Sequence, residues 1–193
     1  EGAERILMVS SNAAATGGDS RAQHRNAIAA AKASGASRVL YTSQMSSSAD
    51  SHFPPGREHA ATEAMLAESG LRWTALRHGF YAGSALMMNR AGFEQGQLVG
   101  PADGKVVWTT HDDLAAVDAL LLAAEDVIDG PTPPLTGTEA LDLADLAQIG
   151  AELLGKPVGR EVIAPEEMAA AARQRGVPEP SVAIMLGYFE AAH

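Results

Sequence analysis

The sequence contains no cysteine, and this absence excludes several classes of protein at once. Disulfide scaffolds, cysteine-ligated zinc sites, thiol redox couples and cysteine nucleophiles all require that side chain. Lysine is almost as scarce, because it occurs only at positions 32, 105 and 156 of the 193 residues. The chemistry of this chain must therefore come from other side chains or from a bound cofactor.

Basic charge and long apolar runs are also lacking. The 14 basic side chains are outnumbered by 24 acidic ones, which gives a formal net charge of -10. Because nucleic acids and anionic membranes attract basic surfaces, neither is an expected partner. The longest purely apolar stretch, Ala119–Ala124, is far too short to span a bilayer. No basic-then-apolar leader opens the chain, so the cytoplasm is the expected compartment.

Several nucleotide-binding and catalytic motifs are absent as well. The chain has no Gly-x-Gly-x-x-Gly, no Walker loop, no Gly-x-Ser-x-Gly elbow and no His-Glu-x-x-His helix. The Tyr-x-x-x-Lys pair of short-chain dehydrogenases is missing too, because no lysine follows Tyr41, Tyr81 or Tyr188 at that spacing. His111-Asp112-Asp113 is more typical of a helix start than of a metal site, so no metal is expected.

The order of apolar segments predicts the fold. Short continuous apolar runs, typical of strands buried on both faces, alternate with helical segments. This alternation predicts an α/β, Rossmann-like fold with a doubly wound parallel sheet in residues 1–129, and a smaller, mainly helical cap in residues 130–193. Strands are expected at 5–10, 38–42, 71–77, 105–109, 135–139 and 160–163, and helices at 20–34, 58–69, 80–93, 112–125, 142–154, 165–175 and 180–192.

Four segments together resemble one protein family. They are Gln23–Gly35, Val39–Ser43, Glu58–Gly70 and Leu76–Tyr81, in this order and at this spacing. The set resembles the NmrA-like atypical short-chain dehydrogenases, in particular the bacterial NAD(P)H:quinone oxidoreductases and their triphenylmethane-reductase relatives. The resemblance implies NADP(H), in preference to NAD(H), as the cofactor of a Rossmann-type domain. It also implies hydride transfer to a quinone-like or other conjugated small-molecule acceptor.

The resemblance further implies the residues of the site, which follow the strands. His59 is the candidate catalytic residue, as a ribose contact or as the proton donor to the reduced acceptor. The candidate substrate pocket consists of Tyr81, Met87 and Met88, and the loop 44–56 is long enough to shape it. Contacts with the cofactor are expected from Ser10, Ser11, Asn12, Thr42, Ser43, His59, His78, Gly79 and Phe80.

Each of these residues also has a purely structural interpretation. Ser10 and Ser11 would simply end a strand, and His59 would cap a helix. The aromatic and methionine side chains would belong to the core. Gly79 indicates that another group approaches the backbone closely at this point.

The sequence departs from the family at its beginning. The family opens with a strand, a glycine-rich turn and a helix that bind the cofactor pyrophosphate, within a first half of roughly 70 residues. Because nothing equivalent precedes Glu1, we expect either that the sequence is part of a longer reductase or that another chain completes the sheet in a homodimer. The alternative functions are a non-catalytic NmrA-like sensor that binds the dinucleotide and regulates a partner, and a module that acts only through protein contacts.

Overall fold

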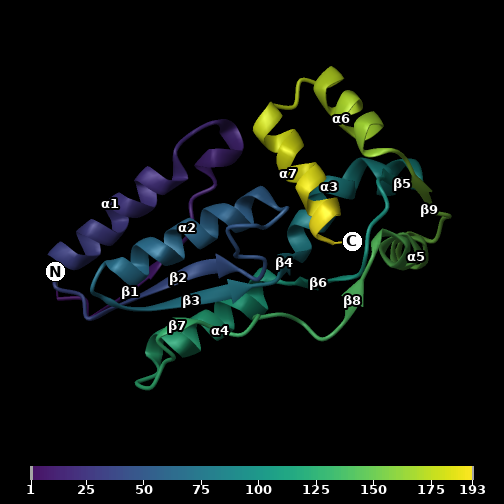
Figure 1. Cartoon of the computed structure of the whole chain (residues 1–193). Helices are drawn as coiled ribbons and strands as arrows, with labels where there is room; N and C mark the ends of the chain where they lie inside the picture. The colour runs from purple at the N-terminus through teal and green to yellow at the C-terminus, as the bar shows by residue number, and fades with distance from the viewer. Residues whose placement is uncertain (1, 193) are drawn as a thin grey trace.

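The structure is a computed structural model, and it describes residues 2–192. Its centre is a parallel sheet with the strand order β1-β2-β3-β7. Helices α1 and α2 cover one face of this sheet and α4 covers the other (Figure 1). The doubly wound α/β fold is thus confirmed. Its elements are β1 (Arg5–Met8), the 3-10 helix η1 (Ala13–Thr16), α1 (Ser20–Ala33), β2 (Arg38–Gln44), α2 (Pro54–Glu68), β3 (Arg72–His78), α4 (His111–Ala123) and β7 (Gly130–Pro131).

Strand β2 lies in the middle of the sheet and is buried at every position. It pairs in parallel with β1 on one side and β3 on the other, so both of its edges are hydrogen-bonded. Val39 and Tyr41 of β2 pack with Ile28 of α1 and Leu66 of α2 in the main hydrophobic core. A strand that is covered on both faces needs a continuous apolar run, which is the pattern that the sequence shows here.

The remaining elements lie at the end toward which β2 and β3 point (Figure 1). An aromatic cluster joins helix α7 to the end of the main sheet, with Tyr188 packed on Phe80 and Trp108. Gly187 lets α7 come close, because a Cβ there would lie 2.5 Å from the His52 carbonyl oxygen. The elements are β4 (Phe80–Tyr81), α3 (Ala82–Gln95), β5 (Gln97–Gly100), β6 (Val106–Thr109), β8 (Ala140–Leu141), α5 (Leu143–Leu154), β9 (Gly159–Val162), α6 (Pro165–Gln174) and α7 (Glu179–Ala191).

Three of the expected elements are placed differently in the structure. The helix predicted at 58–69 begins already at Pro54, so the loop after β2 comprises residues 45–53 rather than the expected 44–56. The helix predicted at 80–93 begins only at Ala82, because Phe80 and Tyr81 pair with β6 as strand β4. The strand predicted at 135–139 was wrong, since Leu135 makes only a single bridge to His78 and the strand is β8 instead. Strand β5 was not predicted, and it pairs in parallel with β9. These short strands depend on partners distant in the sequence, which local patterns do not reveal.

The division between residues 129 and 130 stays a prediction. The segment after it contributes β7 to the main sheet and β8 to a small sheet with β4 and β6. Helices α5, α6 and α7 then follow, as the expected mainly helical cap would require. None of the helices within residues 2–192 has the length and apolar character needed to cross a membrane.

Candidate active site

Most of the predicted site residues lie where β1, β2 and β3 end, and Met87 and Met88 are the exceptions. Because these strands are parallel and in register, their carboxyl ends meet at one edge of the sheet. Open α/β sheets bind ligands at this edge, in the crevice outside the strand ends. Ser10 and Thr42 meet directly there, since the Ser10 backbone N–H donates to Thr42 Oγ1 over 2.8 Å and the Thr42 hydroxyl contacts Ser10 Oγ at 3.3 Å.

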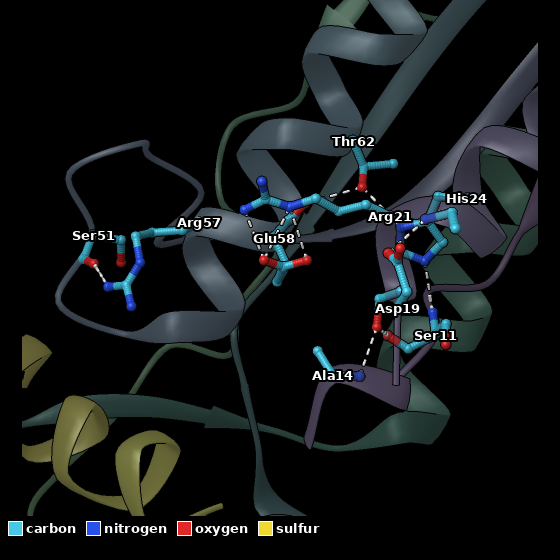
Figure 2. Close-up of polar contacts among 11 residues, drawn as sticks. Ser11, Ala14, Asp19, Arg21, His24, Ser51, Arg57, Glu58 and Thr62 are labelled. Atoms are coloured by element: carbon cyan, nitrogen blue, oxygen red, sulfur yellow. Dashed lines mark hydrogen bonds and ion pairs between the residues drawn. The ribbon is translucent and has the colours of Figure 1, made fainter. Parts of the chain in front are cut away.

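The turn after β1 is held by a polar network that extends into α1 and α2 (Figure 2). The Ser11 backbone N–H donates to His24 Nε2 over 2.8 Å, and the Ser11 hydroxyl bonds the Gln23 side chain. Asn12 follows and accepts a backbone hydrogen bond from Ala15 at the start of η1. The turn that carries the candidate residues Ser10, Ser11 and Asn12 is therefore anchored, rather than merely the end of a strand.

His59 lies in the first half of α2 and is mostly buried. Its Nδ1 is 2.8 Å from the hydroxyl of Tyr41, a fully buried residue of β2. Burial lowers the pKa of His59 to about 4, and the neighbouring His24 and His78 act in the same direction, whereas the Glu63 carboxylate acts against it. The ring is therefore neutral near pH 7. The Tyr41 hydroxyl and His59 Nδ1 share this hydrogen bond, and the neutral ring has one N–H, on either Nδ1 or Nε2.

Ser43 occupies a different environment from its neighbour Thr42. It is fully buried, and its hydroxyl donates to Glu63 Oε1 over 2.6 Å. The Glu63 carboxylate is held in turn by Arg77, whose guanidinium reaches both of its oxygens. The Ser43 hydroxyl is thus committed to a buried carboxylate, and the contact with the cofactor that was expected of Ser43 stays a prediction.

His78 ends β3 and forms a buried pair with Asp118 of α4. The distance from His78 Nε2 to Asp118 Oδ1 is 2.9 Å, and both side chains are nearly inaccessible to solvent. The other ring nitrogen, Nδ1, is 3.5 Å from the hydroxyl of Tyr81. Burial raises the pKa of Tyr81, and the charge of Asp118 raises it further. Asp118, His78 and Tyr81 are thus linked in this order, from helix α4 to the end of β4.

Gly79 and Phe80 have packing roles in this structure. A Cβ at Gly79 would lie 2.9 Å from Thr109 Oγ1, so the absence of a side chain lets β6 approach the backbone. Phe80 packs edge-to-face on Phe53 and on Tyr188. Each residue is held against neighbouring elements at the end of β3.

Met87 and Met88 lie apart from the strand ends, on helix α3. Their exposed fractions are 73% and 48%, and neither contributes to the two main hollows of the surface. Their assignment to the acceptor pocket stays a prediction, in which they would line an open face rather than an enclosed one.

Two hollows on the surface of residues 2–192 border the elements described above. One, of about 380 Å³, lies between α7 and the segment that leads into α2, and it carries four charged or titratable side chains: Asp50, His52, Arg57 and Glu190. The other, of about 430 Å³, is an apolar groove between β1 and α1, lined by residues such as Ile6, Met8 and Ala27. The first hollow is lined both by residues before and in α2 and by residues of α7. The second runs along the edge of β1 that has no neighbouring strand among residues 2–192.

Several residues of the site escaped the sequence analysis. His24, Thr62 and Glu63 lie on helix faces whose partners are set by the packing of α1 and α2 on β2. Asp118 looked like an ordinary helix residue, although a buried acid in an apolar run (Ala115–Ala124) was a usable signal. Gln44 was also missed: its amide nitrogen is buried at the end of β2 without a hydrogen-bond partner among the described residues.

No group of three or more metal-ligating side chains comes together within residues 2–192. The polar side chains of the edge are instead hydroxyls, imidazoles and amides that surround a parallel strand end. Such donors suit the ribose, amide and phosphate groups of a dinucleotide, and the unpartnered Gln44 amide adds one more.

Comparison with known proteins agrees with this geometry. Residues 1–123 match the protein family described as NAD(P)H-binding. The chain belongs to this family. Quinone oxidoreductase 2 of Escherichia coli is 36% identical over 180 residues, which are 93% of this chain and 61% of that protein. The resemblance to the NmrA-like oxidoreductases is thus confirmed.

Solved structures show the same relationship. The NADPH complex of the Escherichia coli NADPH-dependent quinone oxidoreductase superposes with a TM-score of 0.87 at 34% identity, and covers 100% of this chain and 66% of that one. The NADP(H) complex of triphenylmethane reductase from Citrobacter sp. superposes with a TM-score of 0.84 at 27% identity, and covers 99% of this chain and 67% of that one. The chain spans a little under two thirds of the length of the first of these relatives.

Proposed function

We propose that the protein is an NAD(P)H-dependent reductase that transfers hydride to a quinone-like or other conjugated small-molecule acceptor. The observation that carries this proposal is the polar edge where β1, β2 and β3 end, in a chain of the NAD(P)H-binding family. Support for the acceptor class comes from the relatives, which are named as a quinone oxidoreductase and an NAD(P)H azoreductase. We further propose NADP(H) over NAD(H), because the quinone oxidoreductase was solved with NADPH.

The residues at the edge suggest how the dinucleotide would be held. Ser10, Ser11 and Asn12 offer hydroxyl, amide and backbone groups on an anchored turn, and Thr42 lies beside them. When bound, the dinucleotide supplies the hydride, so the protein needs little acid-base chemistry of its own. The absence of a Tyr-x-x-x-Lys pair is compatible with a reaction in which the cofactor supplies most of the chemistry.

His59 acts in this proposal as a neutral hydrogen-bond donor rather than as an acid. Its low pKa keeps the ring uncharged, and we propose that the Tyr41 hydroxyl donates to Nδ1, which leaves the ring proton on Nε2. An Nε2–H that points away from the buried Tyr41 would bond an oxygen of the acceptor or of the ribose. A fixed donor of this kind stabilises charge that develops on an acceptor oxygen without having to reorganise.

The reduced acceptor also requires one proton, and Tyr81 is the proposed source. Its hydroxyl lies next to His78 Nδ1, and Asp118 accepts from the opposite side of the same ring. Burial and the charge of Asp118 raise the pKa of Tyr81, so its proton would pass to the acceptor oxygen only after hydride transfer has made that oxygen basic. The cleft between the loop 45–53 and α7 is the proposed entrance for the acceptor, because the loop, the start of α2 and the expected cap all line it.

The test is oxidation of NADPH in the presence of a simple benzoquinone, for the wild type and for His59→Gln. We expect quinone-dependent oxidation by the wild type and at least a tenfold lower kcat for His59→Gln, since a preorganised donor contributes on that scale. Arg25→Gln, at an exposed position of α1, serves as the control and should leave kcat unchanged. Binding of NADPH without oxidation would contradict the reductase and support the sensor, whereas absence of binding would contradict both.

A further inference from the structure

His24 is a buried histidine that the chemistry proposed above does not use. It lies on α1 with an exposed fraction of only 3%, and both of its ring nitrogens have a hydrogen-bond partner. Nε2 faces the backbone N–H of Ser11 at 2.8 Å, and Nδ1 faces the hydroxyl of Thr62 at 2.8 Å. Figure 2 shows this ring between the turn after β1 and helix α2, so that it joins two elements through one side chain.

These two contacts determine which nitrogen carries the proton. A backbone N–H can only donate, so Nε2 must present its lone pair to Ser11. The Thr62 hydroxyl donates its single hydrogen to the Glu58 carbonyl oxygen over 3.0 Å, and therefore accepts from His24. Nδ1 must then carry the hydrogen. Both partners select the neutral ring with its proton on Nδ1.

We propose that His24 is a positioning residue that holds the Ser10–Asn12 turn in its dinucleotide-binding conformation, and that a second proton on its ring releases this turn. The proposal rests on the function proposed above, which gives this turn its contact with the dinucleotide. A protonated ring has an N–H at both positions, so Nε2–H would face the Ser11 N–H, donor against donor. The turn would then have to move or the ring would have to leave its site.

The groups around His24 decide how easily that proton is accepted. The rings of His24 and Tyr41 of β2 pack edge-to-face with their centroids 5.4 Å apart. The ring of His59 of α2 packs in turn on Tyr41. Glu58 of α2 is the facing acid, but Arg21 of α1 binds both of its carboxylate oxygens. Burial lowers the pKa of His24 and outweighs the opposing effect of Glu58. The neutral form is therefore the one present near pH 7.

The experiment compares His24→Gln with His24→Leu. The glutamine amide oxygen replaces Nε2 as an acceptor for the Ser11 N–H, whereas leucine fills the space without an acceptor. In the wild type at pH 7 we expect nitrogen-15 shifts that report a neutral His24 with its proton on Nδ1. In His24→Leu we expect the Ser11 amide to exchange about tenfold faster and NADPH to bind about tenfold more weakly, which is the scale of one lost hydrogen bond.

Acid should separate the positioning role from a merely structural one. As the pH falls below 6, we expect the affinity of the wild type for NADPH to decrease, and the affinity of His24→Gln to change less. Arg25→Gln, on the same helix, controls for charge and should follow the wild type. A charged ring at pH 7, a proton on Nε2, or unchanged NADPH affinity in His24→Leu would each overturn the proposal.

Failure of the proposed function would look different from failure of this inference. If the wild type binds neither NADPH nor NADH at any pH, the reductase proposal fails and the turn loses its assigned ligand. The nitrogen-15 shifts and the exchange of the Ser11 amide do not depend on the dinucleotide. Slow Ser11 exchange in His24→Leu would show that His24 does not hold the turn, even if the wild type binds NADPH well.

Discussion

The histidines on the two faces of the sheet have different hydrogen-bond partners. On the side of α1 and α2, His24 and His59 bond only neutral partners: a backbone amide, a threonine and a tyrosine. On the side of α4, His78 bonds the carboxylate of Asp118 at 2.9 Å. The same residue type therefore serves as a neutral, directional group on one side and as the partner of a buried charge on the other. The neighbouring side chains, rather than burial alone, decide between these uses.

The largest effect is expected from breaking the pair on the α4 side. Asp118→Asn removes the charge that faces His78 and leaves two buried polar groups badly matched, so we expect a loss of about 3 kcal/mol in the free energy of unfolding. Urea unfolding measures this loss. Asp112→Asn, at an exposed position of the same helix, is the control and should change the free energy by less than about 0.5 kcal/mol. Equal values for the two variants would show that the pair contributes nothing.

Acid should lower the free energy of unfolding through His59, which lies on the face of the sheet covered by α1 and α2. The pKa of His59 is about 4 in the folded protein and 6.5 in the unfolded one, so the unfolded state binds more protons between these values. Stability should therefore fall as the pH decreases from about 6.5 to 4, by on the order of 2 kcal/mol from this residue. In His59→Gln the loss over the same range should be smaller. An unchanged slope in that variant would contradict the low pKa of His59.

A smaller effect is expected when the orientation of His59 is lost but its ring is kept. Tyr41→Phe removes the hydroxyl that bonds Nδ1 and should cost about 1 kcal/mol of stability. Because that hydrogen bond favours the neutral ring, the pKa of His59 should rise in this variant. Proton NMR of the ring across the acid range measures the change. A lower or equal pKa would show that Tyr41 does not donate to His59.

The smallest effect is expected at the surface of the α1–α2 contact. Arg21 holds Glu58 through three hydrogen bonds, but the arginine is half exposed, so Arg21→Gln should cost less than about 1 kcal/mol. The same change frees Glu58 to act on His24, and should raise the pKa of His24 slightly. Chemical denaturation gives the first quantity and NMR titration the second. A loss as large as that of Asp118→Asn would invalidate the ranking of these contacts.

Much of the fold could be predicted from the sequence. The buried strand at 38–44 and the helices on either side of it have strong local patterns, and the order of segments such as Glu58–Gly70 indicated the family. The short strands β4, β5 and β8 could not be predicted, because each of them exists only through a partner far away in the sequence. Local periodicity carries no information about such pairings.

The place where the candidate site residues come together could be predicted from the sequence, but the hydrogen bonds among them could not. Ser10, Thr42, His59 and His78 do end up at one sheet edge, as the rule for parallel strands requires. Which hydroxyl or imidazole bonds which partner depends on the packing of helices onto strands. The commitment of Ser43 to Glu63 is an example, since the two residues lie 20 positions apart on different elements.

The most direct test of the account is to follow the backbone amides and histidine rings by NMR while NADPH is added to the wild-type chain. We expect the largest shifts at Ser10, Ser11, Asn12 and His59, at the edge where the strands end. We expect little change along the apolar groove between β1 and α1, which includes Ile6 and Ala27. Shifts concentrated in that groove, or no shifts at saturating NADPH, would contradict the assignment of this edge as the dinucleotide site.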